Sequence, residues 1–181
     1  MRETNRGDEL YFESRESRVG GSFDASLLHQ PVSVLRSRQP LVLSMTSTVT
    51  EAIRAMQADH TGCVVVTDDG TVNTKVNGIF TERDVLFRIV DRGRNPAHLP
   101  LQDVMTPNPE TVSVRSAVAY ALNKMSVGGF RNIPVVDDER RPAFVVSVRD
   151  VVEFLVEYFP REVLNLPPLE GAKSQQAREG A

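Results

Sequence analysis

The sequence predicts an α+β fold made of two copies of one unit, each a small β-sheet packed with two helices. The first observation is an internal repeat, because residues 40–70 align with residues 109–139 without a gap. The aligned identities are Pro40/Pro109, Ser44/Ser113, Ser47/Ser116, Val49/Val118, Ala52/Ala121, Met56/Met125, Val66/Val135, Asp68/Asp137 and Asp69/Asp138. With the register then shifted, the matches continue at Arg83/Arg149, Asp84/Asp150, Val85/Val151 and Val90/Val156. The second observation is that hydrophobic periodicity changes from helical to strand-like at the same place in each copy.

A hydrophobic stripe predicts the first helix of each copy. Apolar residues occur at the i, i+3, i+4, i+7 spacing of one helix face, at Val49, Ala52, Ile53 and Met56 and again at Val118, Ala121, Leu122 and Met125. Thr48 and Glu51 have the spacing of a capping box. We therefore expect the helix of the first copy to begin at Thr48.

Runs of β-branched residues predict the strands. We expect strands at residues 63–67 and 76–80 in the first copy and at 133–136 and 143–146 in the second, each pair preceded by a short strand near 41–43 or 111–114. A second helix follows in each copy, at residues 82–91 and 148–158. A unit of roughly 60 residues is marginally stable alone, so the two copies are expected to pack as a pair.

The boundaries follow from turn residues and composition. Gly93 stands where a helix C-cap is expected, and Pro96 and Pro100 prevent the helix from continuing. We therefore expect an N-terminal extension (1–30), a first unit (31–92), a linker (93–103), a second unit (104–160) and a disordered C-terminal tail (161–181).

The composition excludes several classes of protein. The 181 residues are 40% hydrophobic and 25% charged, which excludes a disordered chain, a collagen-like fibre and a disulfide scaffold. A single cysteine and a charged N-terminus predict a cytoplasmic protein. A net charge of −3 argues against nucleic-acid binding, and no stretch is apolar enough to suggest a membrane partner.

The strongest local signal is the strand-to-helix junction Gly78-Ile79-Phe80-Thr81-Glu82-Arg83-Asp84, with its counterpart at residues 144–150. A hydroxyl followed three residues later by a carboxylate caps a helix. The same geometry suits a nucleotide, because the helix start and hydroxyl can meet a phosphate while the aspartate accepts from ribose hydroxyls. The two interpretations do not exclude each other.

Three features together resemble a known family. They are the duplicated hydroxyl-x-x-Asp motif, the helix start Thr48-Val49-Thr50-Glu51-Ala52, and Arg131-Asn132-Ile133-Pro134-Val135-Val136-Asp137. They resemble tandem CBS domains, the Bateman module, over roughly residues 31–158. The resemblance implies a regulatory, signal-transducing homodimer that binds AMP, ADP or ATP between the copies, with S-adenosylmethionine or NAD as other ligands. It implies no required cofactor and an effector protein of unknown identity.

The resemblance also implies a set of nucleotide-binding residues. In the first copy these are Val42, His60, Thr61, Gly62, Cys63, Gly78, Ile79, Thr81, Arg83 and Asp84. In the second they are Thr111, Phe130, Arg131, Asn132, Ile133, Pro134, Val145, Ser147, Arg149 and Asp150. Asp84 and Asp150 would hold riboses, Thr81 and Ser147 would face phosphates, and Arg131 would neutralise phosphate charge through its bidentate guanidinium.

The two copies depart from the pattern in different ways, so the two sites cannot be equivalent. Phe144 replaces Gly78, which we interpret as allowing close ligand approach, and the first copy has Gly62 where the second has Arg131. One occupied site is therefore as consistent with the sequence as two. The same departures leave open a scaffold whose pockets have decayed.

An enzyme is the third hypothesis, and the sequence gives it little support. It shows no convincing nucleophile with a base and no convincing paired-acid site, because the acidic pairs Asp68-Asp69 and Asp137-Asp138 are expected at hairpin turns, so we expect no catalysis. His60 and Cys63 are too few ligands for zinc, so we expect no metal site.

Overall fold

The computed structural model of the chain describes residues 25–35 and 38–158. Contacts within it separate Ser26–Phe154 from the two ends of the chain, and the packing discussed below lies within Ser26–Phe154. The C-terminal tail and most of the N-terminal extension expected from the sequence lie outside the described residues.

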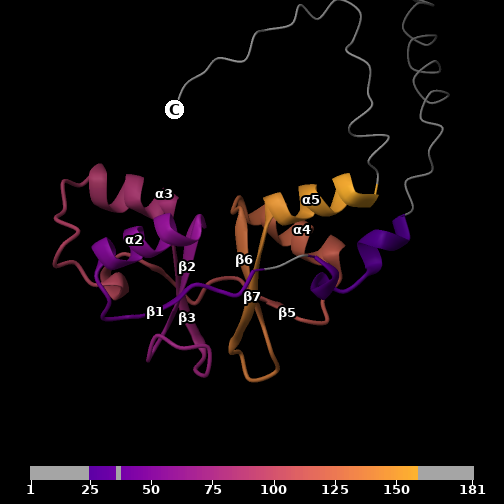
Figure 1. Ribbon diagram of the computed structural model, residues 1–181, viewed down its shortest axis with the longest axis horizontal. Coiled ribbons are helices and arrows are strands. Elements are labelled where there is room, and N and C mark those ends of the chain that lie inside the picture. The colour runs from indigo at the N-terminus through magenta and orange to yellow at the C-terminus, as the bar shows by residue number, and fades with distance from the viewer. Residues whose placement is uncertain (1–24, 36–37, 159–181) are drawn as a thin grey trace, which may run out of the picture. The chain divides into compact units, whose positions relative to one another are not determined.

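Each copy contains a small sheet of the same topology (Figure 1). The first sheet has the order β1 (Val42–Ser44), β2 (Cys63–Thr67), β3 (Val76–Thr81) and β4 (Thr106–Pro107). The second has the order β5 (Val112–Ser113), β6 (Asn132–Val136) and β7 (Pro142–Ser147). In both, the first strand is parallel to the second and the second is antiparallel to the third.

The register repeats as well, which confirms the duplication at the level of backbone pairing. Val42 pairs with Val65 in the first sheet and Val112 with Val135 in the second. Both second strands carry a register irregularity, between Val66 and Thr67 and between Val135 and Val136. The α+β fold of two like units is therefore as predicted.

The first helix of each copy forms where its stripe predicts. Helix α2 spans Val49–Asp59 and helix α4 spans Val118–Gly128. The capping box of α2 is formed, since Glu51 N donates to Thr48 Oγ1 over 3.2 Å and Thr48 N donates to Glu51 Oε2 over 2.7 Å. In the second copy Ala117 stands at the N-cap, and no side chain caps α4.

The second helices of the two copies differ. Helix α5 spans Val148–Tyr158, as predicted. In the first copy only a short α3 (Glu82–Asp84) is α-helical, and Val85–Val90 form a π-helix. Its wide turn is visible in the hydrogen bond from Asp91 N to Leu86 O, 3.0 Å long. The helix predicted over 82–91 is therefore present, but most of it is wound as a π-helix, a type that hydrophobic periodicity does not distinguish from an α-helix.

The linker completes the core of the first copy. Leu101, Val104 and Met105 are buried in one cluster with residues of α2, β2 and β3. Leu101 N donates to Ser47 O over 2.9 Å, which seats the linker against the start of α2. Residues 101–105 therefore pack with the first copy, across the boundary at residue 104 that the sequence predicts for the second unit.

Residues 30–35 contact the start of helix α4 in the second copy, as the linker contacts the start of helix α2 in the first. Val32 N donates to Ser116 O over 2.8 Å, and Val118 N donates to Gln30 O over 2.9 Å. The side chains of Val32 and Leu35 are buried. Each repeat thus receives a strap at the start of its first helix: Pro31–Leu35 on the second copy and Pro100–Val104 on the first.

The copies also contact each other through their sheets. Val65 and Val76 of the first copy form a buried cluster with Val136 of the second, joined by Val42 and Val145. Val76 N donates to Arg140 O over 3.0 Å, so the two hairpins are joined by a backbone bond.

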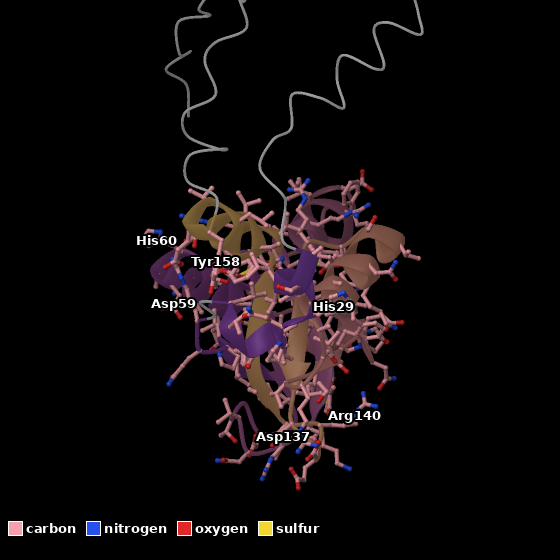
Figure 2. All side chains as sticks on the ribbon, turned by 90° about the vertical axis from the view of Figure 1, so that its right-hand side faces the viewer. His29, Asp59, His60, Asp137, Arg140 and Tyr158 are labelled. Carbon is pink, nitrogen blue, oxygen red and sulfur yellow. The ribbon has the colours of Figure 1, made fainter. Side chains whose placement is uncertain are left out.

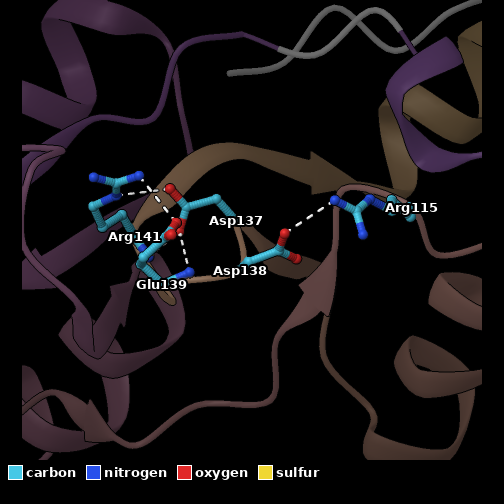
Figure 3. A network of polar contacts seen from close by, with 5 residues as sticks. All are labelled: Arg115, Asp137, Asp138, Glu139 and Arg141. Atoms are coloured by element: carbon cyan, nitrogen blue, oxygen red, sulfur yellow. Dashed lines mark hydrogen bonds and ion pairs between the residues drawn. The ribbon is translucent and has the colours of Figure 1, made fainter.

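Acidic residues at the hairpin tips hold the turns. At the second tip, Arg141 Nε lies 2.7 Å from Asp137 Oδ2, and Arg115 pairs with Asp138 (Figure 3). At the first tip, hydrogen bonds from Thr74 and Thr71 hold the pKa of Asp69 below its ordinary value. These contacts fit the interpretation of both acidic pairs as turn residues.

Candidate functional site

A pocket of about 1250 Å³ lies between the two copies. Its walls are the segment from Arg38 to Leu41, the face of α2, the loop from Asp59 to Cys63, and the start of α5. In Figure 2, Asp59 and His60 mark this loop, which lies far from the hairpin tip at Asp137 and Arg140. The pocket is large enough for a nucleotide.

The pocket gathers half of the binding residues expected from the sequence. They are His60, Thr61, Gly62, Cys63, Arg131, Asn132, Val145, Ser147, Arg149 and Asp150. The others are not part of its lining, namely Val42, Gly78, Ile79, Thr81, Arg83, Asp84, Thr111, Phe130, Ile133 and Pro134. The site therefore combines the loop of the first copy with the hydroxyl-x-x-Asp motif of the second.

The loop wall is shaped by an unusual backbone conformation. His60 ends α2 with φ of +50°, in the left-handed region, and its counterpart Gly129 ends α4 with φ of +66°. Arg38 donates from Nη1 to the backbone oxygen of Asp59 over 3.3 Å, which ties the entering segment to the same loop.

The opposite wall is the capped start of α5. Ser147 N and Ser147 Oγ both donate to Asp150 Oδ2, over 2.6 and 2.7 Å, and Asp150 N donates to Ser147 Oγ over 3.2 Å. The capping interpretation of the motif is therefore correct. Within the described part of the chain, Asp150 Oδ1 has no hydrogen bond and no ion pair reaches Asp150, so one carboxylate oxygen remains able to accept from a ligand.

Arginines and carboxylates share the rim of the pocket. Arg149 pairs with Glu153 at 2.8 Å, and this contact raises the pKa of Arg149. No carboxylate among the described residues pairs with Arg131. Arg38 also lacks a carboxylate partner there but donates to the Asp59 backbone, so Arg131 is the pocket arginine with the most donors open to an anionic group.

Cys63 lies in the pocket lining with its thiol buried. Burial raises the pKa of Cys63 to about 12, opposed by a hydrogen bond with Thr61 and reinforced by the negative charges of Glu82 and Asp150. In this environment Cys63 packs as a small buried apolar residue. Glu82 and Asp150 line the same pocket, and their negative charges act on the Cys63 thiol.

This environment predicts slow alkylation of Cys63, the chain's single cysteine. At pH 8 the native protein is expected to react with iodoacetamide about 1000-fold more slowly than the urea-unfolded chain, because the thiolate is so much scarcer. Mass spectrometry of samples quenched over time measures both rates, and equal rates would contradict the assignment. The raised pKa also means that this group's stabilising effect is complete below pH 9 and is lost as pH rises toward about 12.

Gly78 has a role other than the one expected. A Cβ at this position would collide with Met105 Sδ, so the glycine admits the Met105 side chain to the core of the first copy. Gly62 differs, since the nearest atom to a Cβ there is Glu82 Oε2 at 3.3 Å, the end of a flexible side chain.

Sequence reasoning missed part of the lining. Residues 38–41 line the pocket and directly precede Val42, one of the expected binding residues, so the prediction missed the lining by a few positions. Glu82 lies inside the recognised motif but was not selected. Gln57 and the other α2 residues gave no signal, because the hydrophobic stripe alone cannot show which part of a helix borders a cavity.

Two duplicated sheets with a pocket between them define a paired-domain architecture, and comparison with known proteins identifies its class. The family model of the CBS domain matches at residues 32–91 and 101–157. The chain belongs to the CBS domain family, with two such domains in tandem.

Relatives and solved structures agree with this assignment. A CBS domain-containing protein of Arabidopsis thaliana is 33% identical over 143 residues, covering 75% of this chain and 25% of its own length. A CBS domain protein from Pyrobaculum aerophilum, solved in complex with AMP, is 26% identical with a TM-score of 0.63, covering 70% of this chain and 96% of that one. A CBS domain pair solved with 5′-methylthioadenosine and S-adenosylmethionine has a TM-score of 0.63 at 22% identity over 71% of this chain and 98% of that one, which shows a shared fold. The chain spans about a sixth to a quarter of the first curated relatives.

None of the helices among the described residues is long and apolar enough to cross a membrane. No group of three or more His, Cys, Asp or Glu side chains among these residues is arranged to hold a metal ion.

Proposed function

We propose that this chain is a regulatory module that binds an adenosine-containing nucleotide in the pocket between its two CBS domains. AMP, ADP and ATP are the first candidates, and S-adenosylmethionine and NAD are the others. The supporting observation is that one pocket is lined both by Ser147 and Asp150 of the second copy and by the His60–Cys63 loop of the first. The AMP complex of the Pyrobaculum protein supports the ligand class.

Each wall has a distinct proposed role. Asp150 Oδ1 accepts from the ribose hydroxyls, while the backbone of the His60–Cys63 loop borders the adenine. Arg131 neutralises the phosphate, because its fork of N–H donors matches phosphate oxygens. Glu82 and Asp150 add negative charge to the same pocket, which favours a monophosphate over a triphosphate.

A ligand panel tests the proposal. Thermal unfolding is measured with AMP, ADP, ATP, S-adenosylmethionine and NADH. A ligand present at 100 times its Kd adds about 2.7 kcal/mol to the free energy of unfolding, which raises Tm by roughly 5–10 °C. The absence of any shift at millimolar ligand would refute nucleotide binding.

Two arginines of the pocket provide a matched control. Arg131→Gln is expected to weaken AMP binding about tenfold or more, the value of a charge-assisted hydrogen bond. Arg149→Gln should weaken binding less than Arg131→Gln, because Glu153 pairs with Arg149 Nε and offsets its charge. Calorimetric titration with AMP measures the affinity of both variants. A larger loss of affinity for Arg149→Gln than for Arg131→Gln would contradict the role of Arg131.

We also propose that the chain acts as a homodimer whose shape, or whose affinity for an effector protein, changes with the nucleotide. Large apolar side chains are exposed on the second helices of both copies, at Leu86, Phe87 and Val90 and at Val148 and Val152. The same face supports the alternative of a ligand-independent interaction scaffold. Small-angle X-ray scattering with and without AMP separates them, since a ligand-independent scaffold keeps the same mass and the same radius of gyration in both conditions.

A further inference from the structure

The two hydroxyl-x-x-Asp motifs have nearly the same local geometry. Thr81 Oγ1 lies 2.8 Å from Asp84 Oδ2, and Ser147 Oγ lies 2.7 Å from Asp150 Oδ2. In both, the backbone N–H of the hydroxyl residue donates to the same carboxylate oxygen. One oxygen of each aspartate is therefore used by the cap, and any difference between the motifs depends on the other oxygen.

In the first copy an arginine takes that second oxygen. Arg88 Nε lies 3.1 Å from Asp84 Oδ1, and Asp84 is only 8% exposed. The same arginine donates from Nη1 to Val104 O over 2.7 Å and to Met105 O over 2.6 Å. Its Nη2 donates to Thr106 Oγ1 over 3.1 Å, so all three guanidinium nitrogens are engaged. We name this set of contacts the Arg88 bridge.

The Arg88 bridge engages the second carboxylate oxygen of Asp84, and the residue is buried, so a ribose hydroxyl would have to displace the arginine to reach that oxygen. Both carboxylate oxygens have partners from the chain itself, and the linker carbonyls fix the guanidinium in place. Met105, which the bridge holds through its carbonyl, also fills the space in front of Gly78. The residues expected to form the first nucleotide motif are thus part of the packing between β3, the π-helix and the linker.

The second copy has no equivalent of this bridge. In the matched register Phe154 stands where Arg88 stands in the first copy, and it is buried. A phenylalanine cannot pair with a carboxylate, and no ion pair within the described ranges reaches Asp150. Asp150 instead lines the open pocket, with Oδ1 available.

We infer that the chain has a single nucleotide site, at Asp150, and that the pseudo-symmetric place at Asp84 is permanently closed by the Arg88 bridge. This inference deepens the proposed function and depends on it. Asp84 is a positioning residue for the linker, whereas Asp150 is the binding aspartate.

Stoichiometry on the unmodified full chain gives the first test, and it requires no variant. Isothermal titration with AMP is expected to give one equivalent per chain. Asp150→Asn should then weaken AMP binding at least tenfold without lowering Tm by more than a degree or two. Asp84→Asn should keep AMP affinity within about twofold of the parent while lowering Tm clearly.

The outcomes distinguish a failure of the single-site inference from a failure of the proposed function. Two equivalents of AMP per chain, or an Asp84→Asn variant that loses affinity as much as Asp150→Asn, would overturn the single-site inference and leave nucleotide binding intact. No binding of AMP or of the other panel ligands to the parent chain would overturn the proposed function, and this inference with it. If Asp84→Asn does not fold, the stoichiometry of the parent alone decides.

Discussion

Replacing Leu101 with alanine is expected to lower the free energy of unfolding by about 3 kcal/mol, a fall in Tm of roughly 6–12 °C. Leu101 is fully buried in the core of the first copy although it lies in the connection between the copies. Removing its side chain leaves a cavity against α2 that the surrounding side chains fill only in part. Urea unfolding followed by circular dichroism measures the change.

The adjacent residue supplies the control for this substitution. Gln102 is exposed, and its backbone N–H, which donates to Met45 O, is unaffected by a change of side chain. Gln102→Ala should therefore change stability by less than about 0.5 kcal/mol. Equal effects of the two substitutions would mean that the linker does not belong to the core.

Arg88→Met is expected to cost about 3 kcal/mol. The substitution keeps the length of the side chain but leaves Asp84 charged, buried and without its cation. It also removes the donors to Val104 O and Met105 O. We place the cost at the low end of the range for a broken buried pair, because the Arg88 side chain is 37% exposed and water replaces part of the loss.

Arg83→Met is the matched control, since Arg83 lies one turn earlier and is exposed. Its contact in the described structure is with the ring of Phe87, at 5.5 Å from the ring centre, which contributes little at the surface. Thermal unfolding of both variants at low and high salt distinguishes them. A loss for Arg83→Met as large as that for Arg88→Met would show that general surface charge, rather than the Arg88 bridge, sets the stability.

Most of the fold follows from local signals in the sequence. The capping box at Thr48, the stripe on α2 and the β-branched run at Cys63–Thr67 each specify their element from neighbouring residues alone. The repeat then doubles every such signal, because an element found in one copy supports its counterpart in the other. The strand limits at 63–67 agree with the structure for this reason.

What the sequence did not show depends on contacts between distant residues. The i,i+4 spacing of Asp84 and Arg88 is readable from the sequence, but the other partners of Arg88 lie 16 to 18 residues away in the linker, where no periodicity connects them. Gly78 matched a ligand-approach position in the motif, but its neighbour Met105 occupies that space in the fold.

The candidate site shows the same division between local and distant information. The resemblance to CBS domains places a cleft between the copies, and the residue types of Ser147 and Asp150 are readable from the motif. The sequence does not show which loop lies opposite which motif, because that depends on how the two copies pack together. The pocket joins His60–Cys63 to Ser147–Asp150 across the pair, and the two copies are unequal because one position holds Arg88 and the other Phe154.

The two straps impose an order on folding during synthesis. The larger buried cluster of the first copy draws all its members from residues 41 to 105, so this cluster can form once Met105 has left the ribosome, whereas Val65 and Val76 must wait for Val136. The strap of the second copy, Pro31–Leu35, is made first but has its hydrogen-bond partners only after Ser116 and Val118 emerge. The nascent chain must therefore keep Val32 and Leu35 unburied while more than eighty further residues are translated. An isolated second domain that begins at the linker would lack this strap altogether.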